Sequence, residues 1–481
     1  MITPDSPDRL YSTRLRTAVV LTGSGTAGAY HAGVLRALHE AGVRTDVVAG
    51  RGMGAVSALF AAVDGAPRLW EPSGIWKGGA ARRFYQWRAA LRVAAGALLA
   101  AGAVLLFPLL LFGIAILVGL AGFLMTLVGF GEAGSALTAG FGGRLQQWFS
   151  PGALPLLVPR LVLFAVFVAA GAVVVSLVLH LARARASRRA RGGLLWRLIG
   201  SPLSPAQTLE AFALQLWTLI RGAAPLQQPR DAELARRYVE LLTDNLGQPG
   251  FRELLLVVHD LDARQDLIAA FLAEQHRARF FGRLLGAPSA ARAAEVLDLS
   301  GVARDHALDV LAASLALPVA TEPHLVHFKA EGPWRGETHR LCDRPGSLTR
   351  VMEEVAAAGA EQIILLTATP RAARPHEMIA RRGDVRGHAG EQLAAFEAAA
   401  LRDVLELFAG RFAGLYVIQP DHNPVGPFDF EGTYDERSDR KYTVPELVDR
   451  GYEDAYRQFI DPIVGASGER MESARSGVRS P

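Results

Sequence analysis

The chain has 481 residues, enough for one large domain or two to three smaller ones at about 150 residues per domain. Hydrophobic residues make up 50% and charged residues 20%, below the charged share of about 25% usual in soluble domains, which indicates concentrated apolar segments. The net charge of +4 does not suggest a nucleic-acid-binding protein, and a single cysteine, Cys342, excludes an internal disulfide framework and a cysteine-cluster metal site.

The chain opens with a short tail and a strand–turn–helix unit. Residues 1–14 contain no apolar run, so we expect no secretory signal there and a cytosolic N-terminus. A buried strand is predicted over residues 17–22, followed by a glycine-rich turn at 23–28 and a helix from residue 29. Glycines let the backbone approach a ligand, and the free N–H groups of a first helical turn attract negative charge. The unit is therefore a potential anion site, although the same pattern also fits the dinucleotide fingerprint G-x-G-x-x-G.

A second strand–turn–helix unit follows directly. Its strand is predicted over residues 45–49, its turn reads G-R-G-M-G over 50–54, and a helix of small residues begins at residue 55. This is the spacing of a nucleophile elbow, G-x-S-x-G, in which a strand turns sharply into a helix. No acidic residue ends the second strand, where the ribose of a dinucleotide would need one, so the pair of turns favours the elbow.

Two apolar runs interrupt the chain after these turns. Residues 93–131 carry no charge, and residues 161–181 form a second run that fits one membrane crossing. As one helix the first run would extend roughly 58 Å at ~1.5 Å per residue, against a bilayer core of about 30 Å. It either crosses once as a long or tilted helix or forms a re-entrant hairpin, with Pro108 as a position where it could kink or break. We favour two transmembrane helices, at about 104–130 and 161–181.

Basic residues flank this insert on both sides, whereas the loop between the runs holds only Arg144 and Arg160. The positive-inside rule then places both flanks, and hence both termini, in the cytoplasm, which requires an even number of crossings. Neither run contains an acid or base except His180 at its end, which favours an anchor over a pore or pump. The arginines after the second run also suit contact with anionic lipid headgroups. These arginines are Arg183, Arg185, Arg188, Arg189 and Arg191.

Further elements are predicted downstream of the insert. Amphipathic helices are expected at 205–222, 229–244, 263–285 and 390–408, and strands at 254–258 and 362–367. Three histidines, His324, His327 and His339, raise the question of a metal site. Residues three apart on a strand face opposite sides, so we expect no metal there.

Together the two turns resemble the patatin-like phospholipase family, whose oxyanion turn is G-G-G-x-R-G and whose elbow is G-x-S-x-G. A later segment at 306–328 resembles the family's "ASxAxP" stretch, which leads to the catalytic Asp motif, here Asp343-Arg344-Pro345-Gly346. The resemblance covers residues 15–75 and 205–370. It implies a three-layer α/β fold with a mostly parallel central sheet, interrupted here by an inserted transmembrane helical hairpin. It also implies lipid as the substrate class, acyl-ester hydrolysis by a Ser–Asp dyad, and no cofactor or metal.

The three catalytic motifs all depart from the family pattern. The resemblance assigns the oxyanion turn to Gly23, Ser24, Gly25 and Gly28, and the elbow to Gly50, Met53 and Gly54. The nucleophile position is Gly52, which has no side chain to acylate. In the oxyanion turn, Ser24 replaces the second glycine and Ala27 replaces the arginine. The dyad acid position keeps Asp343 but loses the small residues that follow it.

We therefore interpret the chain as a membrane-anchored, patatin-like pseudoenzyme associated with lipid at the cytoplasmic face of a bacterial inner membrane. One alternative is an active lipid acyl hydrolase that uses another nucleophile, such as Ser24. A small-solute transporter is disfavoured by the charge-free runs. The expected division is an N-terminal tail (1–14), two parts of the patatin-like domain (15–76 and 200–375), the membrane insert (77–199), a C-terminal extension (376–470) and a disordered tail (471–481).

Overall fold

A computed structural model describes residues 11–148, 150, 154–184, 200–285, 295–331, 334–371 and 385–465. The chain divides into two compact units, one of Met1–Gln86 with Leu203–Pro481 and one of Trp87–Pro202. The insert was expected to begin at residue 77. Around that position the chain is still buried in the core of the first unit, at Trp76, Phe84 and Tyr85. Arg183 lies near the end of the last helix of the second unit. Arg185, Arg188, Arg189, Arg191 and the tail 471–481 lie outside the described residues.

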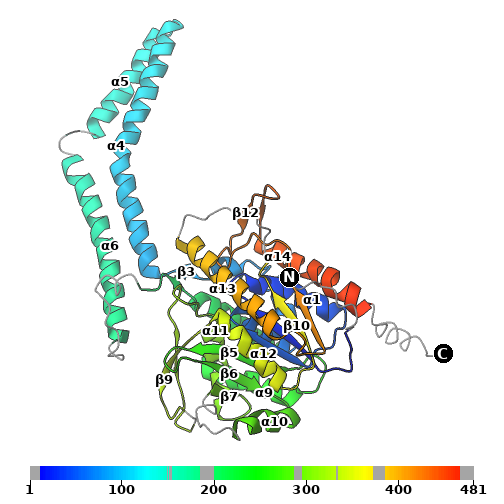
Figure 1. Ribbon diagram of the computed structural model, residues 1–481. Helices are drawn as coiled ribbons and strands as arrows, with labels where there is room; N and C mark the ends of the chain where they lie inside the picture. Colours follow the sequence, from blue (N-terminus) through cyan, green and yellow to red (C-terminus); the bar gives the residue numbers. More distant parts are fainter. Residues whose placement is uncertain are drawn as a thin grey trace. The chain divides into compact units, whose positions relative to one another are not determined.

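The first unit is built around a nine-stranded, mostly parallel sheet (Figure 1). Its order is β11-β10-β1-β2-β5-β6-β7, with β9 paired to β5 and β8 paired to β9. The strands from β11 to β5 run parallel, whereas β5 pairs with β6 and β9 in antiparallel fashion. The strand bounds are β1 (Thr17–Thr22), β2 (Val47–Arg51), β5 (Glu253–Asp260), β6 (Gln265–Phe271), β7 (Val296–Asp298), β8 (His324–His327), β9 (Thr338–Cys342), β10 (Gln362–Thr367) and β11 (Gly414–Ile418). The expected α/β fold with a mostly parallel sheet is confirmed.

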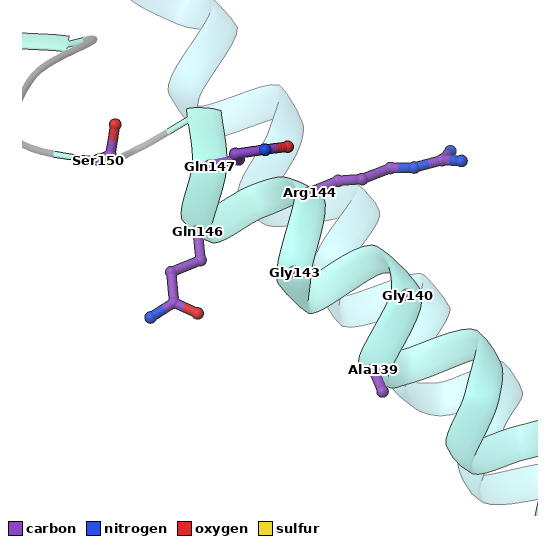
Figure 2. A pocket seen from close by; sticks show the side chains of 7 residues that line it. All are labelled: Ala139, Gly140, Gly143, Arg144, Gln146, Gln147 and Ser150. Atoms are coloured by element: carbon purple, nitrogen blue, oxygen red, sulfur yellow. The ribbon is translucent and has the colours of Figure 1, made fainter.

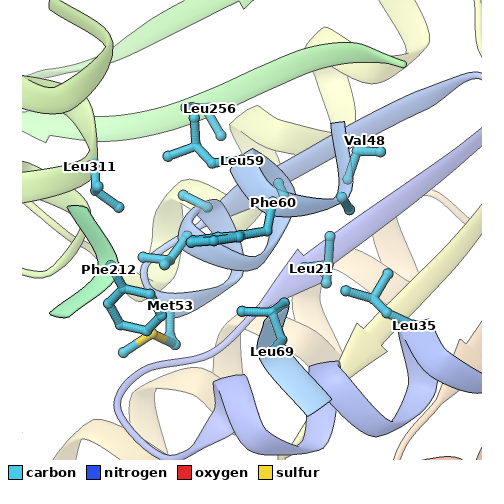
Figure 3. Close-up of a cluster of buried hydrophobic side chains, with 14 of the residues drawn as sticks. Leu21, Leu35, Val48, Met53, Leu59, Phe60, Leu69, Phe212, Leu256 and Leu311 are labelled. Atoms are coloured by element: carbon cyan, nitrogen blue, oxygen red, sulfur yellow. The ribbon is translucent and has the colours of Figure 1, made fainter. Parts of the chain in front are cut away.

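Helices cover both faces of this sheet, because its central strands are apolar on both sides. Along β1, Val19 and Leu21 face one core cluster, and Ala18 and Val20 face the other. Figure 3 shows the first cluster, in which Phe212 and Met53 lie close together beside the sheet. The helices over the first cluster are α1 (Ala27–Glu40), α2 (Met53–Ala62), α3 (Pro67–Trp70), α8 (Ala206–Arg221), α9 (Asp231–Asn245), α11 (Ala307–Ser314) and α14 (Val444–Ala455). The helices over the second are α10 (Glu274–Leu285), α12 (Leu348–Ala357) and α13 (Val385–Leu407).

Short elements complete this unit. They are the 3-10 helices η1 (Ala80–Arg83), η3 (Val302–His306) and η4 (Pro345–Ser347), the π-helix η5 (Tyr456–Val464), and two small sheets, β3 (Gln86–Trp87) with β4 (Leu203–Ser204) and β12 (Thr433–Asp435) with β13 (Arg440–Tyr442). The helix predicted over 263–285 is wrong in its first part, which is strand β6. Its apolar residues pair with β5 in the sheet, and this burial overrides their helical spacing.

Where the structure describes the second unit, it contains the helices α4 (Ala89–Leu127), α5 (Gly131–Trp148) and α6 (Leu154–Ala184). Helix α4 continues through Pro108 and packs against both α5 and α6. A methyl group added at Gly134 would lie 2.6 Å from the carbonyl oxygen of Gly122, so α4 and α5 approach at glycines. Two segments, Ala89–Leu127 and Pro159–Ser176, are long and apolar enough to cross a membrane by length and composition, with most side chains exposed. That alone is weak evidence for a membrane, and the hairpin is not established as membrane-spanning.

Candidate active site

The turn between β2 and α2 has the strand-to-helix geometry expected of an elbow. Gly52 precedes α2 with φ +56° and ψ −135°, a backbone conformation that glycine adopts without strain. Its neighbours Gly50 and Gly54 also need to be small, because a methyl group at Gly50 would lie 2.6 Å from the backbone of Gly54 and one at Gly54 would overlap the carbonyl of Leu21. The turn is therefore shaped by close backbone packing at these three glycine positions.

Asp343 lies directly beside Gly52. It follows β9 and is held in place by its backbone N–H, which donates to the carbonyl of Ala316 at 2.8 Å. A Cβ atom built at Gly52 would lie 2.6 Å from Oδ2 of Asp343 and 2.7 Å from the carbonyl oxygen of Gly23. The structure thus brings together the predicted nucleophile position, Gly52, and the predicted acid, Asp343, with the carboxylate in the space that a side chain at position 52 would take.

Arg51, which the sequence analysis did not single out, binds Asp343 with its guanidinium group. Its Nε donates to Oδ1 of Asp343 at 2.9 Å and its Nη2 to Oδ2 at 2.7 Å, a two-pronged geometry. Its Nη1 donates to the hydroxyl of Thr22 at 3.1 Å. The side chains of Arg51 and Asp343 are 1% and 0% exposed. Burial alone disfavours the charged guanidinium, but Asp343 and Glu397 outweigh it and hold the pKa of Arg51 above its ordinary value.

Glu397 on α13 completes the network, and the sequence offered no signal for it. Its Oε1 lies 2.6 Å from Oγ of Ser24 and 3.2 Å from Nη2 of Arg51. Oγ of Ser24 also lies 3.1 Å from Oδ2 of Asp343. Burial raises the pKa of Glu397, against the opposing effect of Arg51.

The predicted oxyanion turn is engaged by the chain's own backbone. The N–H of Met53, which follows the nucleophile position and would supply an oxyanion donor in an elbow, donates to the carbonyl of Gly23 at 2.8 Å. The N–H of Thr26 donates to the carbonyl of Pro427 at 3.1 Å. A methyl group at Gly25 would overlap that same carbonyl. The C-terminal extension therefore places a peptide oxygen against the turn.

Side chains fill the surroundings of the turn. Trp76 packs against Gly28 and joins an aromatic group with Phe84 and Phe212. Ser24, Arg51 and Asp343 are at most 1% exposed, and Glu397 is 9% exposed.

Two hollows in the described part of the chain lie elsewhere, and neither borders Gly52. One lies on α5, lined by Ala139, Gly140, Gly143, Arg144, Gln146, Gln147 and Ser150 (Figure 2). The other is small and lies under α1, next to Leu35, Leu38 and Val48.

The remaining candidates are accounted for by packing and pairing. Oγ of Ser57 donates to the carbonyl of Met53 at 3.2 Å, and Ser314 donates to that of Val310 at 2.8 Å. His324 and His339 pair with carboxylates, and the described residues contain no group of three or more metal-ligating side chains. His31, a further buried residue, lies with Nε2 3.1 Å from the carbonyl of Thr22.

Comparison with known proteins finds the patatin-like phospholipase family over residues 19–122. The triacylglycerol lipase ptl3 of Schizosaccharomyces pombe is 46% identical over 55 residues, which are 11% of this chain and 11% of that protein. The crystal structure of VipD from Legionella pneumophila aligns over 94% of this chain and 67% of that chain, with a TM-score of 0.30 and 12% identity. The resemblance to the family drawn from the glycine-rich turns is confirmed. The chain matches only about a tenth of the curated relative, so that protein's substrate is not assigned here.

Proposed function

Since the chain is a relative of the patatin-like phospholipases, a lipid acyl hydrolase family, we propose that it is a membrane-anchored member that binds lipid without hydrolysing it. The observation that carries the proposal is the ion pair beneath Gly52. The nucleophile position has no side chain, and the carboxylate that would serve the dyad is bound on both oxygens by Arg51.

Each step of acyl-ester hydrolysis lacks its group in this arrangement. Formation of an acyl-enzyme needs a hydroxyl at position 52 and a base that can take its proton. Both carboxylate oxygens of Asp343 already accept hydrogen bonds, from Arg51 and from Ser24. A tetrahedral intermediate needs free N–H donors, yet the N–H groups of Met53 and Thr26 donate to Gly23 and Pro427. The same contacts leave the site buried and closed, which suits a structural core better than catalysis.

Anchoring by the insert is supported by chain connectivity. Strands β1 and β2 precede the insert, and β5 and β10 follow it, yet all four belong to one sheet. Both ends of the insert must therefore lie on the same side of any membrane that it enters. An even number of crossings satisfies this condition and agrees with the basic residues on both flanks. We place the α/β unit at the cytoplasmic face of a bacterial inner membrane on these grounds.

The proposal is tested by measuring turnover of phospholipid and of p-nitrophenyl esters by the purified full-length protein in detergent. A fluorophosphonate probe is applied in parallel, and an active patatin-like phospholipase serves as the positive control. We expect turnover at the rate of buffer alone and no labelled serine. Ester turnover that co-purifies with the protein, together with labelling of any serine, would overturn the proposal.

A hydrolase that uses Ser24 remains the second candidate, because Oγ of Ser24 lies 2.6 Å from Oε1 of Glu397, within reach of a base. Against it, Ser24 is 1% exposed and its oxygen also accepts from Arg51. The variant Ser24→Ala separates the two, with Ser57→Ala as a matched control at another buried serine. Labelling that disappears in Ser24→Ala and persists in Ser57→Ala would establish this candidate.

A further inference from the structure

The place where the insert leaves the α/β unit carries exposed groups that the proposed function does not explain. Strand β3, which precedes the insert, pairs with β4, which follows it, so the chain departs and returns at one point. We call the exposed residues of the first unit at this point the root surface and define it as Arg82, Arg83, Pro318 and Val319. All four are exposed.

Val319 is presented outward by a strained turn. The N–H of Ala320 donates to the carbonyl of Pro318 at 2.7 Å, and Val319 between them has φ +65°. This is the rarer, strained form of the γ-turn, and a β-branched residue at positive φ is a true outlier. The side chain of Val319 is nevertheless 90% exposed. Strained backbone of this kind is found at contact sites, so we take this exposed turn as a candidate for an external contact.

The strained turn is joined to the insert through the backbone. The N–H of Leu203, the first residue of β4, donates to the carbonyl of Ala320 at 3.0 Å. Val319 therefore lies one residue from the point where the insert rejoins the sheet unit.

Arg82 and Arg83 add positive charge to the root surface. They end η1 and precede β3 by only two residues, Phe84 and Tyr85. Within the part of the chain that the structure describes, neither guanidinium group forms an ion pair. Most other arginines of this unit bind carboxylates, as Arg340 binds Asp262 and Arg277 binds Asp298. Arg82 and Arg83 precede β3, and Val319 is connected to its partner strand β4 through the Leu203–Ala320 hydrogen bond. Positive charge together with an exposed aliphatic side chain matches a layer of anionic headgroups above hydrocarbon.

We propose that the root surface docks onto the anionic headgroup layer of the bilayer that holds the insert, with Val319 entering the interface. This rests on the proposed anchoring and adds that the α/β unit is held against the lipid rather than free above it. Aliphatic side chains partition into the interface, and each arginine near an anionic surface strengthens contact about fivefold. The docked state would keep the closed site at a fixed height over the membrane.

The test uses full-length protein in vesicles of neutral lipid with or without about a third of anionic lipid. Native Cys342 is buried, and burial raises the pKa of its thiol to about 12, so it stays unlabelled by maleimide near neutral pH. An environment-sensitive fluorophore is attached at Val319→Cys, and quenching by spin-labelled lipid is measured. Leu117→Cys on α4, 65% exposed, reports whether the insert is in lipid. Glu274→Cys on α10, an exposed site at the other end of this unit from β3 (Figure 1), is the control for a surface in water.

We expect strong quenching at 117, clear quenching at 319 in anionic vesicles and none at 274. Reversal of both arginines, Arg82→Glu with Arg83→Glu, should reduce quenching at 319 at least fivefold, whereas Arg279→Glu on α10 should not. Quenching at 117 without quenching at 319 overturns docking and leaves anchoring intact. A fluorophore at 319 that is shielded from water but not quenched by lipid assigns the surface to a protein and also overturns docking. Absence of quenching at 117 overturns the anchoring itself, and docking with it.

Discussion

At the scale of single residues, Arg51 determines what the elbow can do. A serine introduced at position 52 would place its Cβ only 2.6 Å from Oδ2 of Asp343, on a backbone with φ +56°. Its hydroxyl would also lie beside a carboxylate that already accepts hydrogen bonds from Nε and Nη2 of Arg51. We propose that the missing hydroxyl group at position 52 and the binding of Asp343 by Arg51 are two separate barriers to catalysis. Only the first of them can be predicted from the sequence.

We therefore expect that Gly52→Ser alone restores neither fluorophosphonate labelling nor ester turnover. The variant should also be less stable than the wild type, because the new methylene group forces Asp343 or the Gly23 carbonyl to move. Labelling and thermal unfolding are measured on the same preparation. Efficient labelling of a stably folded Gly52→Ser variant at the introduced hydroxyl would show that Arg51 does not disable the dyad.

The buried ion pair between Arg51 and Asp343 leads to a prediction about the free energy of unfolding. Arg51→Met leaves Asp343 charged, 0% exposed and without its main partner, which should cost about 3–5 kcal/mol of unfolding free energy. The double variant Arg51→Met with Asp343→Asn removes the uncompensated charge and should be more stable than Arg51→Met alone. Denaturant unfolding of the wild type, both single variants and the double variant measures this coupling. Additive effects would mean that the pair is not energetically coupled.

His31 predicts how stability responds to acid. Burial lowers the pKa of His31 to about 4 from an ordinary value of 6.5, helped by nearby Arg51. The unfolded chain then binds a proton between these values that the folded chain does not. Its contribution to stability is complete above pH 6.5 and is lost as the pH falls towards 4. We expect His31→Gln, which keeps a donor for Thr22, to flatten this acid loss by up to about 3 kcal/mol in unfolding experiments between these limits. If the unfolding free energy of His31→Gln depended on pH as that of the wild type does, His31 would not be the cause of the acid loss.

At the scale of elements, much of the α/β core is readable from sequence because local pattern and burial agree. The strand predicted at 17–22 is β1, and that at 362–367 is β10. Both are continuous apolar runs buried on two faces, which only a sheet covered by helices on both sides accommodates. The helix predicted over 263–285 is wrong in its first part, where the spacing fits a helix but a turn at Arg264, with φ +59°, returns the chain along β5 as β6. Its second part is helix α10. Pairing between strands is a tertiary effect that periodicity does not record.

The candidate site could likewise be predicted only in part from the sequence. Gly52 and Asp343 were found because each lies in a motif that resembles the family's own. Arg51 lies inside the elbow motif, but at a position where any residue is allowed, so nothing marked it. Glu397 lies 346 residues from Arg51 and joins it only because α13 packs over the site. Such contacts between distant segments require the fold, not the motif.

The C-terminal extension proves to be part of the core through one close helix pair. Helix α14 packs on α1 where Gly33 faces Val448 and Gly451 faces Tyr30, and a methyl group at either glycine would overlap a carbonyl of the partner helix. Gly451→Ala or Gly33→Ala should therefore lower the free energy of unfolding by about 1–3 kcal/mol despite alanine's better helix propensity. Gly282→Ala on α10, where nothing lies within 4 Å of the added methyl group, is the control and should be neutral or stabilising. Equal melting temperatures for all three would show that the two helices do not pack this closely.

At the scale of the whole molecule, connectivity restricts how the insert can sit in a membrane. One sheet contains strands from both sides of the insert, so crossings must be even. Helix α4 has 39 residues, and about 20 suffice to cross the hydrocarbon core. If Arg88 and Arg92 lie at the cytoplasmic face, as we propose, α4 is long enough for its end and the start of α5 to reach the other side.

We therefore predict that Glu132, in the first turn of α5, faces the compartment opposite to the α/β unit. In intact bacterial cells, a membrane-impermeant maleimide should label Glu132→Cys, whereas Glu274→Cys on α10 should react only after the cells are opened. The buried native Cys342 gives no background. Labelling of both positions in intact cells would place the α/β unit outside. Labelling of neither position would mean that the insert does not cross, and its apolar helices would then have to be covered by protein instead of lipid.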